Sequence, residues 1–413
     1  MIKSETYNFY VSQIEEDFVP YWSKFVDREN GGIFNCINNF GDKKLSDHKF
    51  TWSQGRYLWI LGKIYDLSQK NILTKIDYND IKFQMDKTYE FISKYAIYDN
   101  KCCYLLDAVG NKLIDEKTNR YDASIFADCF ALIGMVQYVK SLHKVELVDE
   151  VRNLYESIVD RIESGKFLTE PYPIPPNYKV HSIPMILLNT TYEYIKMLQR
   201  MHLQHTKEIN YGLKQIDTIL VEFHRDGLIR EHVSTDENYE TRMLDRHINP
   251  GHTLECMWFV IEFLKEFGDI HKYLPSIINI AQKNFDLGWD KKHGGLFRFV
   301  DRDGIAPHGK MGDSDFEILI ENTHDMKLWW PHSEMLYVFL LIYEVTQDKR
   351  MLENYEKAYE YTFKTFPNRE IGEWIQIRKR DGSPEERLVA LPVKDPFHIL
   401  RNFIKIVELY EMR

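Results

Sequence analysis

One stretch of the sequence, residues 249–260, combines acid–base side chains with the beginning of an apolar helix. It reads NPGHTLECMWFV, in which Pro250 and Gly251 form a turn before the predicted helix. His252 lies where the turn becomes helix, and Glu255 lies one turn further on the same face. A titratable histidine–carboxylate pair at the mouth of a buried helix is suited to proton transfer.

Comparable side chains stand at the beginnings of the other apolar helices that the sequence predicts. They are Trp52, Gln54 and Arg56; Asp128; His181 and Asn189; Trp329, Trp330, His332 and Glu334; and His398 and Arg401. A lone histidine on such a helix is more often a structural residue that is held by hydrogen bonds. Several at equivalent positions of different helices favour a shared site, in which we expect these side chains to meet a substrate.

The repeated histidines limit the chemistry that such a site can do. Histidine has a reference pKa near ~6.5 and can accept or give a proton near neutrality. Two histidines on opposite faces of one carbon could remove a proton from one side and return it on the other. An arginine could stabilise the oxyanion of an enediolate, and tryptophans could stack on a sugar. The combination favours a sugar epimerase or an aldose–ketose isomerase.

Other classes of protein compete with this interpretation. A glycoside hydrolase would use paired carboxylates, but carboxylates do not outnumber histidines at the helix starts. The candidate carboxylates are Asp128, Glu255, Glu321, Asp325 and Glu334. No metal site is predicted, because the sequence has no HxH or HExxH motif. A toroid or open α-solenoid that binds a sugar or a protein without catalysis is the remaining alternative.

The helices that must position these residues fall into two classes. Amphipathic segments, with apolar residues three and four apart and charged residues between, predict outer helices at 72–96, 145–163, 207–224, 270–286 and 350–366. More apolar segments predict inner helices at 52–65, 124–138, 181–198, 251–267, 329–343 and 396–410.

Short, strand-like patches that contain glycine precede most of the inner helices. One pattern, Asp-x-x-x-Gly-Gly-aliphatic-Phe, occurs at both 27–34 and 290–297, which indicates a repeat unit of roughly 70 residues. Six such units predict an all-α (α/α)6 barrel, a toroid of helical hairpins with short β-hairpin loops at one end, formed by residues 1–413 as a single domain. A closed ring would gather the polar helix starts at one mouth.

The composition argues against several kinds of partner. The chain has 413 residues, a net charge of −10 and no block of basic residues, so neither a nucleic acid nor a membrane is expected to bind. The first residues lack the apolar core of a signal peptide, and no apolar run is long enough to span a bilayer. Five cysteines, without metal-type spacing, favour a reducing, cytoplasmic compartment.

Six segments carry a specific resemblance to a known family. They are FTWSQGRYLW (50–59), SIFADCFAL (124–132), NPGHTLECMWF (249–259), WDKKHGGLFRFVDRDG (289–304), MKLWWPHSEML (326–336) and DPFHILR (395–401). Over nearly its whole length the chain resembles the N-acylglucosamine 2-epimerase family, which also contains cellobiose 2-epimerases and isomerases acting on mannose or sulfoquinovose. The resemblance implies an (α/α)6 barrel and proton exchange at C2 of an opened sugar.

The resemblance also implies roles for individual residues. His252 and His398 match the histidines that exchange the C2 proton, and His181 matches one that assists ring opening or binds the sugar. Arg56 matches the arginine near the carbonyl and enediolate oxygens, and Glu255 matches the carboxylate that supports the histidine. Positions of the pocket wall are matched by Trp52, Trp329, Trp330 and Glu334.

The last repeat departs from the family pattern, since it reads ERLVALPVKDPFH where related epimerases more often have a Lys-Gly-Gly run. The segment THDMKLWWPHSE resembles the N-acylhexosamine enzymes more than the cellobiose enzymes. We therefore expect a 2-epimerase that interconverts N-acetylglucosamine and N-acetylmannosamine through an enediolate. A mannose–fructose type isomerase and a cellobiose or mannobiose 2-epimerase are the alternatives on the same site.

The expected substrate is a small sugar, and no cofactor is required for the predicted chemistry. Some members of the family are activated by nucleotides, but no residue pattern in this sequence points to a nucleotide site. A homodimer is compatible with the resemblance.

Overall fold

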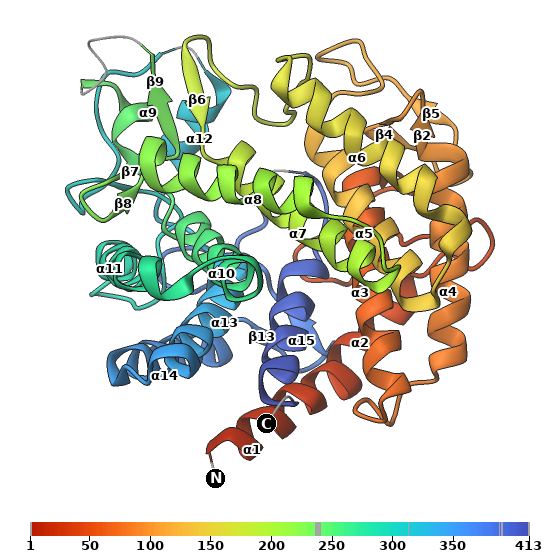
Figure 1. Ribbon diagram of the computed structural model, residues 1–413. Helices are drawn as coiled ribbons and strands as arrows, with labels where there is room; N and C mark the ends of the chain where they lie inside the picture. The colour runs from red at the N-terminus through yellow and green to blue at the C-terminus, as the bar shows by residue number, and fades with distance from the viewer. Residues whose placement is uncertain (1, 236–240, 313, 388, 390, 412–413) are drawn as a thin grey trace.

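The protein is described by a computed structural model that covers residues 2–235, 241–312, 314–387, 389 and 391–411 (Figure 1). Within this part of the chain, six long helices form an inner ring. They are α3 (Thr51–Gln69), α5 (Ile125–Leu142), α7 (Ser182–Arg200), α10 (Pro250–Phe267), α13 (Trp329–Thr346) and α15 (Phe397–Glu411). Each packs against the next in this order, and α15 packs against α3 to close the ring.

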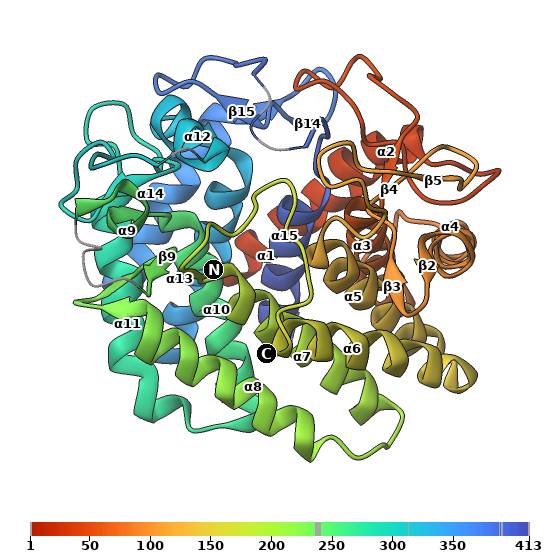
Figure 2. The same ribbon diagram turned by 90° about the horizontal axis from the view of Figure 1, so that it is seen from above.

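Outer helices accompany the inner ones, and Figure 2 shows α4, α8 and α11 at the periphery of the molecule. The outer helices are α1 (Ile2–Ser12) with α2 (Val19–Trp22), α4 (Tyr78–Phe91), α6 (Val148–Glu163), α8 (Thr206–Thr218), α11 (Ile270–Gly288) and α14 (Lys349–Thr365). The structure is therefore the (α/α)6 barrel that the sequence predicted.

The outer helix at the N-terminus was not predicted. α1 continues through a π-helical turn, Gln13–Phe18, into α2 and packs against α15. It buries Tyr10, Ile14 and Phe18 almost completely. These three residues recur every four positions, which is longer than the α-helical period of ~3.6 residues, and the wider π-turn keeps them on one face.

The main hydrophobic core lies between the two rings and uses many of the aromatic residues. Tyr89 of α4 stacks on Tyr138 of α5 with ring centroids 4.3 Å apart, and Tyr155 of α6 stacks on Tyr194 of α7 at 4.2 Å. Such pairs contribute about 0.5–1.5 kcal/mol beyond the burial of their area. Aromatic residues make up 14% of the chain, and many of them therefore stabilise the barrel instead of lining a ligand site.

Among the described helices, α5 alone has the length and the apolar composition of a membrane span. In the barrel 78% of that segment is buried, because α5 packs between α3 and α7. Its apolar surface is thus covered by its neighbours, as expected of an inner helix.

Short antiparallel strand pairs lie in the connections between the helices. Three pairs are local hairpins that follow outer helices: β2 (Ile97–Tyr98) with β3 (Lys101–Cys102), β7 (His224–Arg225) with β8 (Leu228–Ile229), and β13 (Pro367–Asn368) with β14 (Glu373–Trp374). The predicted hairpin loops are present, but other strand pairs join segments that are distant in the sequence.

The distant pairs fix the beginnings of four inner helices. They are β1 (Lys49–Phe50) with β4 (Leu105–Leu106); β6 (Tyr178–Val180) with β9 (His232–Ser234); β10 (His247–Ile248) with β11 (Val300–Asp301); and β12 (Lys327–Leu328) with β15 (Ile377–Arg378). β4 also forms a local hairpin with β5 (Lys112–Leu113). β1, β6, β10 and β12 directly precede α3, α7, α10 and α13. The starts of these four inner helices are thereby anchored to the next repeat.

The repeated Gly-Gly pattern forms the same turn twice. Lys49 Nζ lies 2.7 Å from Asp27 Oδ2, and Lys327 Nζ lies 3.3 Å from Asp290 Oδ2, with both lysines fully buried. Gly31–Gly32 and Gly294–Gly295 have φ angles between 74° and 92°, a backbone conformation that residues with a side chain rarely adopt. The repeat found in the sequence is therefore a repeat in three dimensions. Two further helices, α9 (Met243–Arg246) and α12 (Asp315–Thr323), lie in the connections that lead to α10 and α13.

Candidate active site

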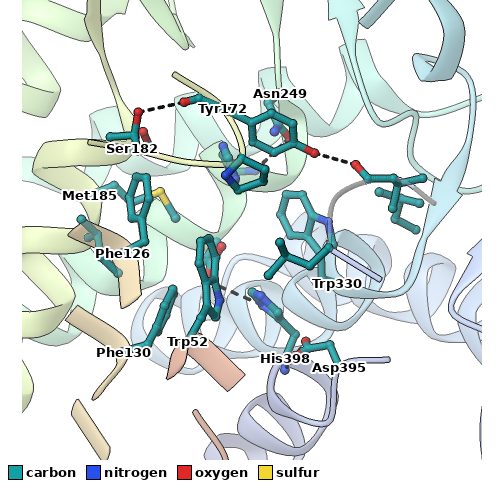
Figure 3. Close-up of a pocket in the computed structure, with 18 of the residues that line it drawn as sticks. Trp52, Phe126, Phe130, Tyr172, Ser182, Met185, Asn249, Trp330, Asp395 and His398 are labelled. Carbon is teal, nitrogen blue, oxygen red and sulfur yellow. Dashed lines mark hydrogen bonds and ion pairs between the residues drawn. The ribbon is translucent and has the colours of Figure 1, made fainter. Parts of the chain in front are cut away.

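A cavity of about 270 Å³ opens where the N-terminal ends of the inner helices meet. Its lining comes from α3, α5, α7, α10, α13 and α15 and from the loops that precede them. Figure 3 shows Trp52, Phe126 and Phe130 on one side and Trp330 and His398 facing them. Of the predicted site residues, those that line the cavity are Trp52, Arg56, Asn189, His252, Glu255, Trp329, Trp330, His398 and Arg401.

His252 is held by a carboxylate that the sequence did not reveal. Its backbone N–H donates to the capping side chain of Asn249 at 3.2 Å, which fixes the first turn of α10. Its Nδ1 lies 3.0 Å from Glu231 Oε2, and the other carboxylate oxygen of Glu231 lies 3.4 Å from Nδ1 of His181. Burial lowers the pKa of His252, but the charge and hydrogen bond of Glu231 outweigh burial and raise it above its usual value.

Glu231 lies between β8 and β9 and binds two histidines at once. Burial raises its pKa, but His252 and His181 outweigh that effect and hold the pKa well below its ordinary value. His181 is fully buried behind Glu231 and its ring does not line the cavity, so the structure does not place it against a sugar. Its backbone N–H donates to the carbonyl of Glu231 at 2.9 Å, which positions the carboxylate.

His398 has its own carboxylate, from a different helix. Its Nδ1 lies 2.8 Å from Oε1 of Glu334, a fully buried residue of α13. Arg401 contacts both Glu334, at 2.6 Å, and Glu255. Burial raises the pKa of Glu334, but Arg401 and His398 reverse the effect and lower it, so the carboxylate stays ionised beneath the imidazole.

The two histidines present the same nitrogen to the cavity. In each, Nδ1 faces a carboxylate, which leaves Nε2 for a ligand. The indole of Trp330 contacts both imidazoles, with ring centroids 5.0 Å from His252 and 5.7 Å from His398. The two histidines therefore come from different helices to one aromatic ring in the same cavity, where both could reach one bound molecule.

Arg56 adds a positive charge beside His398. Its Nη2 lies 3.3 Å from His398 Nε2, and its Nη1 lies 3.6 Å from Asp395 Oδ1. Its guanidinium packs over Phe130 at 3.9 Å from the ring centroid. Burial lowers the pKa of Arg56 to about 10, so it remains charged at neutral pH. A carboxylate only accepts hydrogen bonds and a guanidinium only donates them, so a proton on Nδ1 of His398 satisfies its 2.8 Å contact with Glu334 and leaves Nε2 to accept from Arg56.

Two predicted carboxylate roles need correction. Glu255 was expected to orient His252 or raise its basicity; its charge does help to raise the pKa of His252, but its direct partner is Arg401, and its Oε1 lies 3.8 Å from Nδ1 of His398. Its position one turn after His252 does not decide its partner, because Arg401 reaches it from α15. Glu334 was expected in the pocket wall, but it lies behind His398 and does not line the cavity.

Two further predicted contacts are structural. Asp128 is fully buried away from the cavity, where it accepts hydrogen bonds from Arg161 at 2.6 Å and from the Cys102 backbone at 2.9 Å. His332 is also fully buried, and its Nε2 accepts from the Leu296 backbone at 3.0 Å. Burial lowers the pKa of His332 to about 3, so the ring is neutral and holds the repeated Gly-Gly turn.

The structure adds lining residues that the sequence analysis did not select. Asp395 caps the start of α15, accepts from Trp329 Nε1 at 3.2 Å and pairs with Arg56. Tyr172 belongs to the proline-rich approach to α7, and Arg298 belongs to the Gly-Gly segment of the fifth repeat. Their signals were weak, because each lies in a connection where helical periodicity gives no information.

Glu255, Glu334 and His398 are close enough together to hold a metal ion. The guanidinium of Arg401 already contacts both carboxylates and supplies their counter-charge. A cation at this position would have to displace Arg401, so the donor set fits an ion-pair network better than a metal centre.

An (α/α)6 barrel with two carboxylate-held histidines in its mouth defines an enzyme built for acid–base chemistry. The chain belongs to the N-acylglucosamine 2-epimerase (GlcNAc 2-epimerase) family, whose profile matches residues 32–401. It is accordingly an isomerase of the epimerase type.

Named relatives cover most of the chain. An N-acylglucosamine 2-epimerase of Bos taurus is 30% identical over 390 residues, which is 93% of this chain and 86% of the relative. That of Mus musculus is 28% identical over 417 residues, covering 96% and 91%. A cellobiose 2-epimerase of Dictyoglomus turgidum is 21% identical over 430 residues, covering 99% and 98%.

Solved structures support the fold. A cellobiose 2-epimerase from Bacillus thermoamylovorans B4167 has a TM-score of 0.74 at 19% identity and covers 98% of this chain and all of its own. A D-mannose isomerase has a TM-score of 0.75 at 14% identity, covering 98% and 97%.

Proposed function

We propose that the protein is a sugar 2-epimerase that interconverts N-acetylglucosamine and N-acetylmannosamine. One observation carries the proposal: His252 and His398 each turn Nδ1 to a buried carboxylate and contact the ring of Trp330 in one cavity. Relatives at 28% and 30% identity that are named N-acylglucosamine 2-epimerases support the choice of sugar. The cellobiose 2-epimerase relative is more distant, at 21%.

In the proposed mechanism the sugar is bound in its open form, so that the C1 carbonyl makes the C2 proton acidic. His398, whose Nε2 accepts from Arg56 in the free protein, takes that proton. The negative charge develops on the C1 oxygen, where Arg56 can stabilise it. His252, with a pKa raised by Glu231, gives a proton to the opposite face of C2. The reverse reaction exchanges the roles of the histidines.

The proposed reaction needs neither a metal nor an organic cofactor, since the two histidines and Arg56 supply proton transfer and charge stabilisation. A nucleotide would act as an activator and not as a reactant. We place the enzyme in the cytoplasm, where its five free and buried cysteines would stay reduced, and propose a homodimer as its assembly.

Incubation in heavy water tests the proposal. N-acetylglucosamine and N-acetylmannosamine should each gain deuterium at C2 and convert into the other, as followed by proton NMR. Glucose, mannose and cellobiose serve as comparison sugars in the same assay. A ketose product from mannose would identify an isomerase instead, and absence of label at C2 in all five sugars would refute proton transfer.

Replacement of Glu231 by Gln tests the support of His252. The variant keeps a hydrogen-bonding side chain but loses the charge that raises the pKa of His252, so that pKa should fall. Where His252 acts as the base, the rise of kcat/KM with pH should therefore move to lower pH, and kcat/KM at neutral pH should drop by about 10-fold or more. Glu222→Gln, which removes a surface partner of Lys179, is the matched control. A normal pH profile in Glu231→Gln would contradict the assignment.

A further inference from the structure

The charges that line the cavity are paired, with one exception. The charged lining residues are Arg56, Glu231, Glu255, Arg298, Asp395 and Arg401. Asp395 lies beside Arg56, Glu255 contacts Arg401, and Glu231 binds His252. Among the residues that the structure describes, Arg298 has no carboxylate within ion-pair distance. Its positive charge is the uncompensated charge of the cavity wall.

Arg298 is surrounded by neutral groups. Its Nη1 donates to Thr323 Oγ1 at 2.8 Å, and its Nη2 donates to the Val389 carbonyl at 2.9 Å and lies 3.5 Å from the Tyr172 hydroxyl. The guanidinium carbon lies 4.9 Å from the ring centroid of Phe299. Only 6% of the residue is exposed, and burial lowers the pKa of the guanidinium.

A buried cation without a counter-charge is costly, because neutral dipoles replace only part of its hydration. Arginine nevertheless remains charged in proteins, and its planar fork matches the oxygens of carboxylates and phosphates. A ligand that brings an oxyanion to Arg298 would supply the charge that the protein chain does not. The cost in the free enzyme would then be offset on binding.

Arg298 lies on the side of the cavity that holds His252. It contacts Thr323, Val389 and Tyr172, and its charge acts on His252, whereas Arg56 lies against His398, Asp395 and Phe130. The cation assigned to the C1 oxyanion and the unpaired cation are therefore separate sites. A sugar bound with C2 between the histidines can present its C1 end to one and a distant substituent to the other.

We propose that Arg298 forms an oxyanion subsite, and that the preferred substrate is an N-acylhexosamine with a phosphate or another oxyanion on a carbon distant from C2. This inference rests on the proposed function, since it assumes a sugar held for proton exchange at C2. The contact joins a fully charged guanidinium to a phosphate of about −1.5 to −2 charges, so it should separate charged from neutral sugars.

The experiment compares N-acetylglucosamine with N-acetylglucosamine 6-phosphate, in calorimetric binding and in deuterium exchange at C2. In the wild type, the phosphorylated sugar should bind and react with a preference of about 10-fold or more, the size of a hydrogen bond between charged groups. Arg298→Met should abolish the preference, and Arg298→Lys should retain part of it. Equal treatment of both sugars by the wild type would overturn the inference.

Tyr172→Phe is the matched control, because Arg298 also holds the Tyr172 and Val389 segments together. It removes the hydroxyl near Arg298 and keeps the charge, so the preference for the phosphorylated sugar should survive. If Tyr172→Phe loses the preference as fully as Arg298→Met, with both variants folded by thermal melting, Arg298 is a structural clamp and the inference is wrong.

Two further results separate the possible failures. If inorganic phosphate binds through Arg298 but the sugar phosphate gains no advantage, the subsite serves a free anion and the substrate inference is overturned. If neither sugar exchanges its C2 hydrogen, the proposed function fails. An Arg298-dependent preference in calorimetry would then still support the oxyanion subsite.

Discussion

His398→Asn should lower the rate of epimerisation by roughly 10²–10⁴-fold, the range that a positioned general acid or base contributes. Asparagine can occupy the space of the imidazole and bond to Glu334, but it cannot carry a proton between C2 and solvent. His252→Asn should cause a loss of similar size, because each epimer presents its C2 proton to only one histidine. Initial rates in both directions measure the effect.

The two variants should differ in which epimer they label with deuterium. In heavy water, the remaining histidine can still remove a proton from the epimer that faces it and return a deuteron to the same side. His398→Asn and His252→Asn should therefore each label one epimer without converting it, and the labelled epimers should be opposite. His324→Asn, at a surface histidine bonded to the Glu321 carbonyl, is the control. Loss of exchange in the same epimer for both variants would contradict a two-base site.

The architecture of the barrel was predictable because it depends on local patterns. Apolar and amphipathic segments alternate along the chain; the apolar segments form the inner ring of helices and the amphipathic segments form outer helices. α1 escaped notice although Tyr10, Ile14 and Phe18 recur every four residues. A spacing of four residues is longer than the α-helical period, and the π-helical turn at Gln13–Phe18 accommodates it. No pattern in the sequence predicts that turn.

The sequence predicted which residues form the site better than it predicted their hydrogen-bond and ion-pair partners. His252, His398, Arg56 and the tryptophans stand at helix starts, and a closed ring brings such positions to one cavity. The partners depend on tertiary contacts: Glu231 reaches His252 from a connection between two short strands, and Arg401 draws Glu255 toward α15. Sequence proximity favoured Glu255 as the partner of His252, and packing gave that place to Glu231.

The buried polar residues at the same positions show why type alone is insufficient. Asp128 and His332 lie near the beginnings of inner helices, as the cavity residues do, yet both make structural contacts away from the cavity. Asp128 neutralises Arg161, and His332 accepts from the Leu296 backbone where Gln54 accepts from Ile33 in the first repeat. The glutamine of one repeat and the histidine of the other accept the same kind of backbone hydrogen bond, so the histidine at this position is a structural residue and not an acid–base group.

Arg56→Met should lower kcat by about 10²–10³-fold with a smaller effect on KM, because the guanidinium acts mainly on charge that develops at the C1 oxygen. Arg56→Lys should recover part of the rate, since it restores the charge but not the flat guanidinium that packs over Phe130. Steady-state kinetics in both directions, with thermal melting of each variant, measure the two effects separately.

The loss in Arg56→Met has a competing explanation, because the substitution leaves Asp395 buried without its arginine. An unpaired carboxylate beside His398 could disturb the base by itself. The double variant Arg56→Met/Asp395→Asn removes that charge, and asparagine can still cap the start of α15. Its melting temperature should rise above that of Arg56→Met, while its kcat should stay low. Recovery of kcat in the double variant would show that Arg56 serves to neutralise Asp395 and not to stabilise the oxyanion.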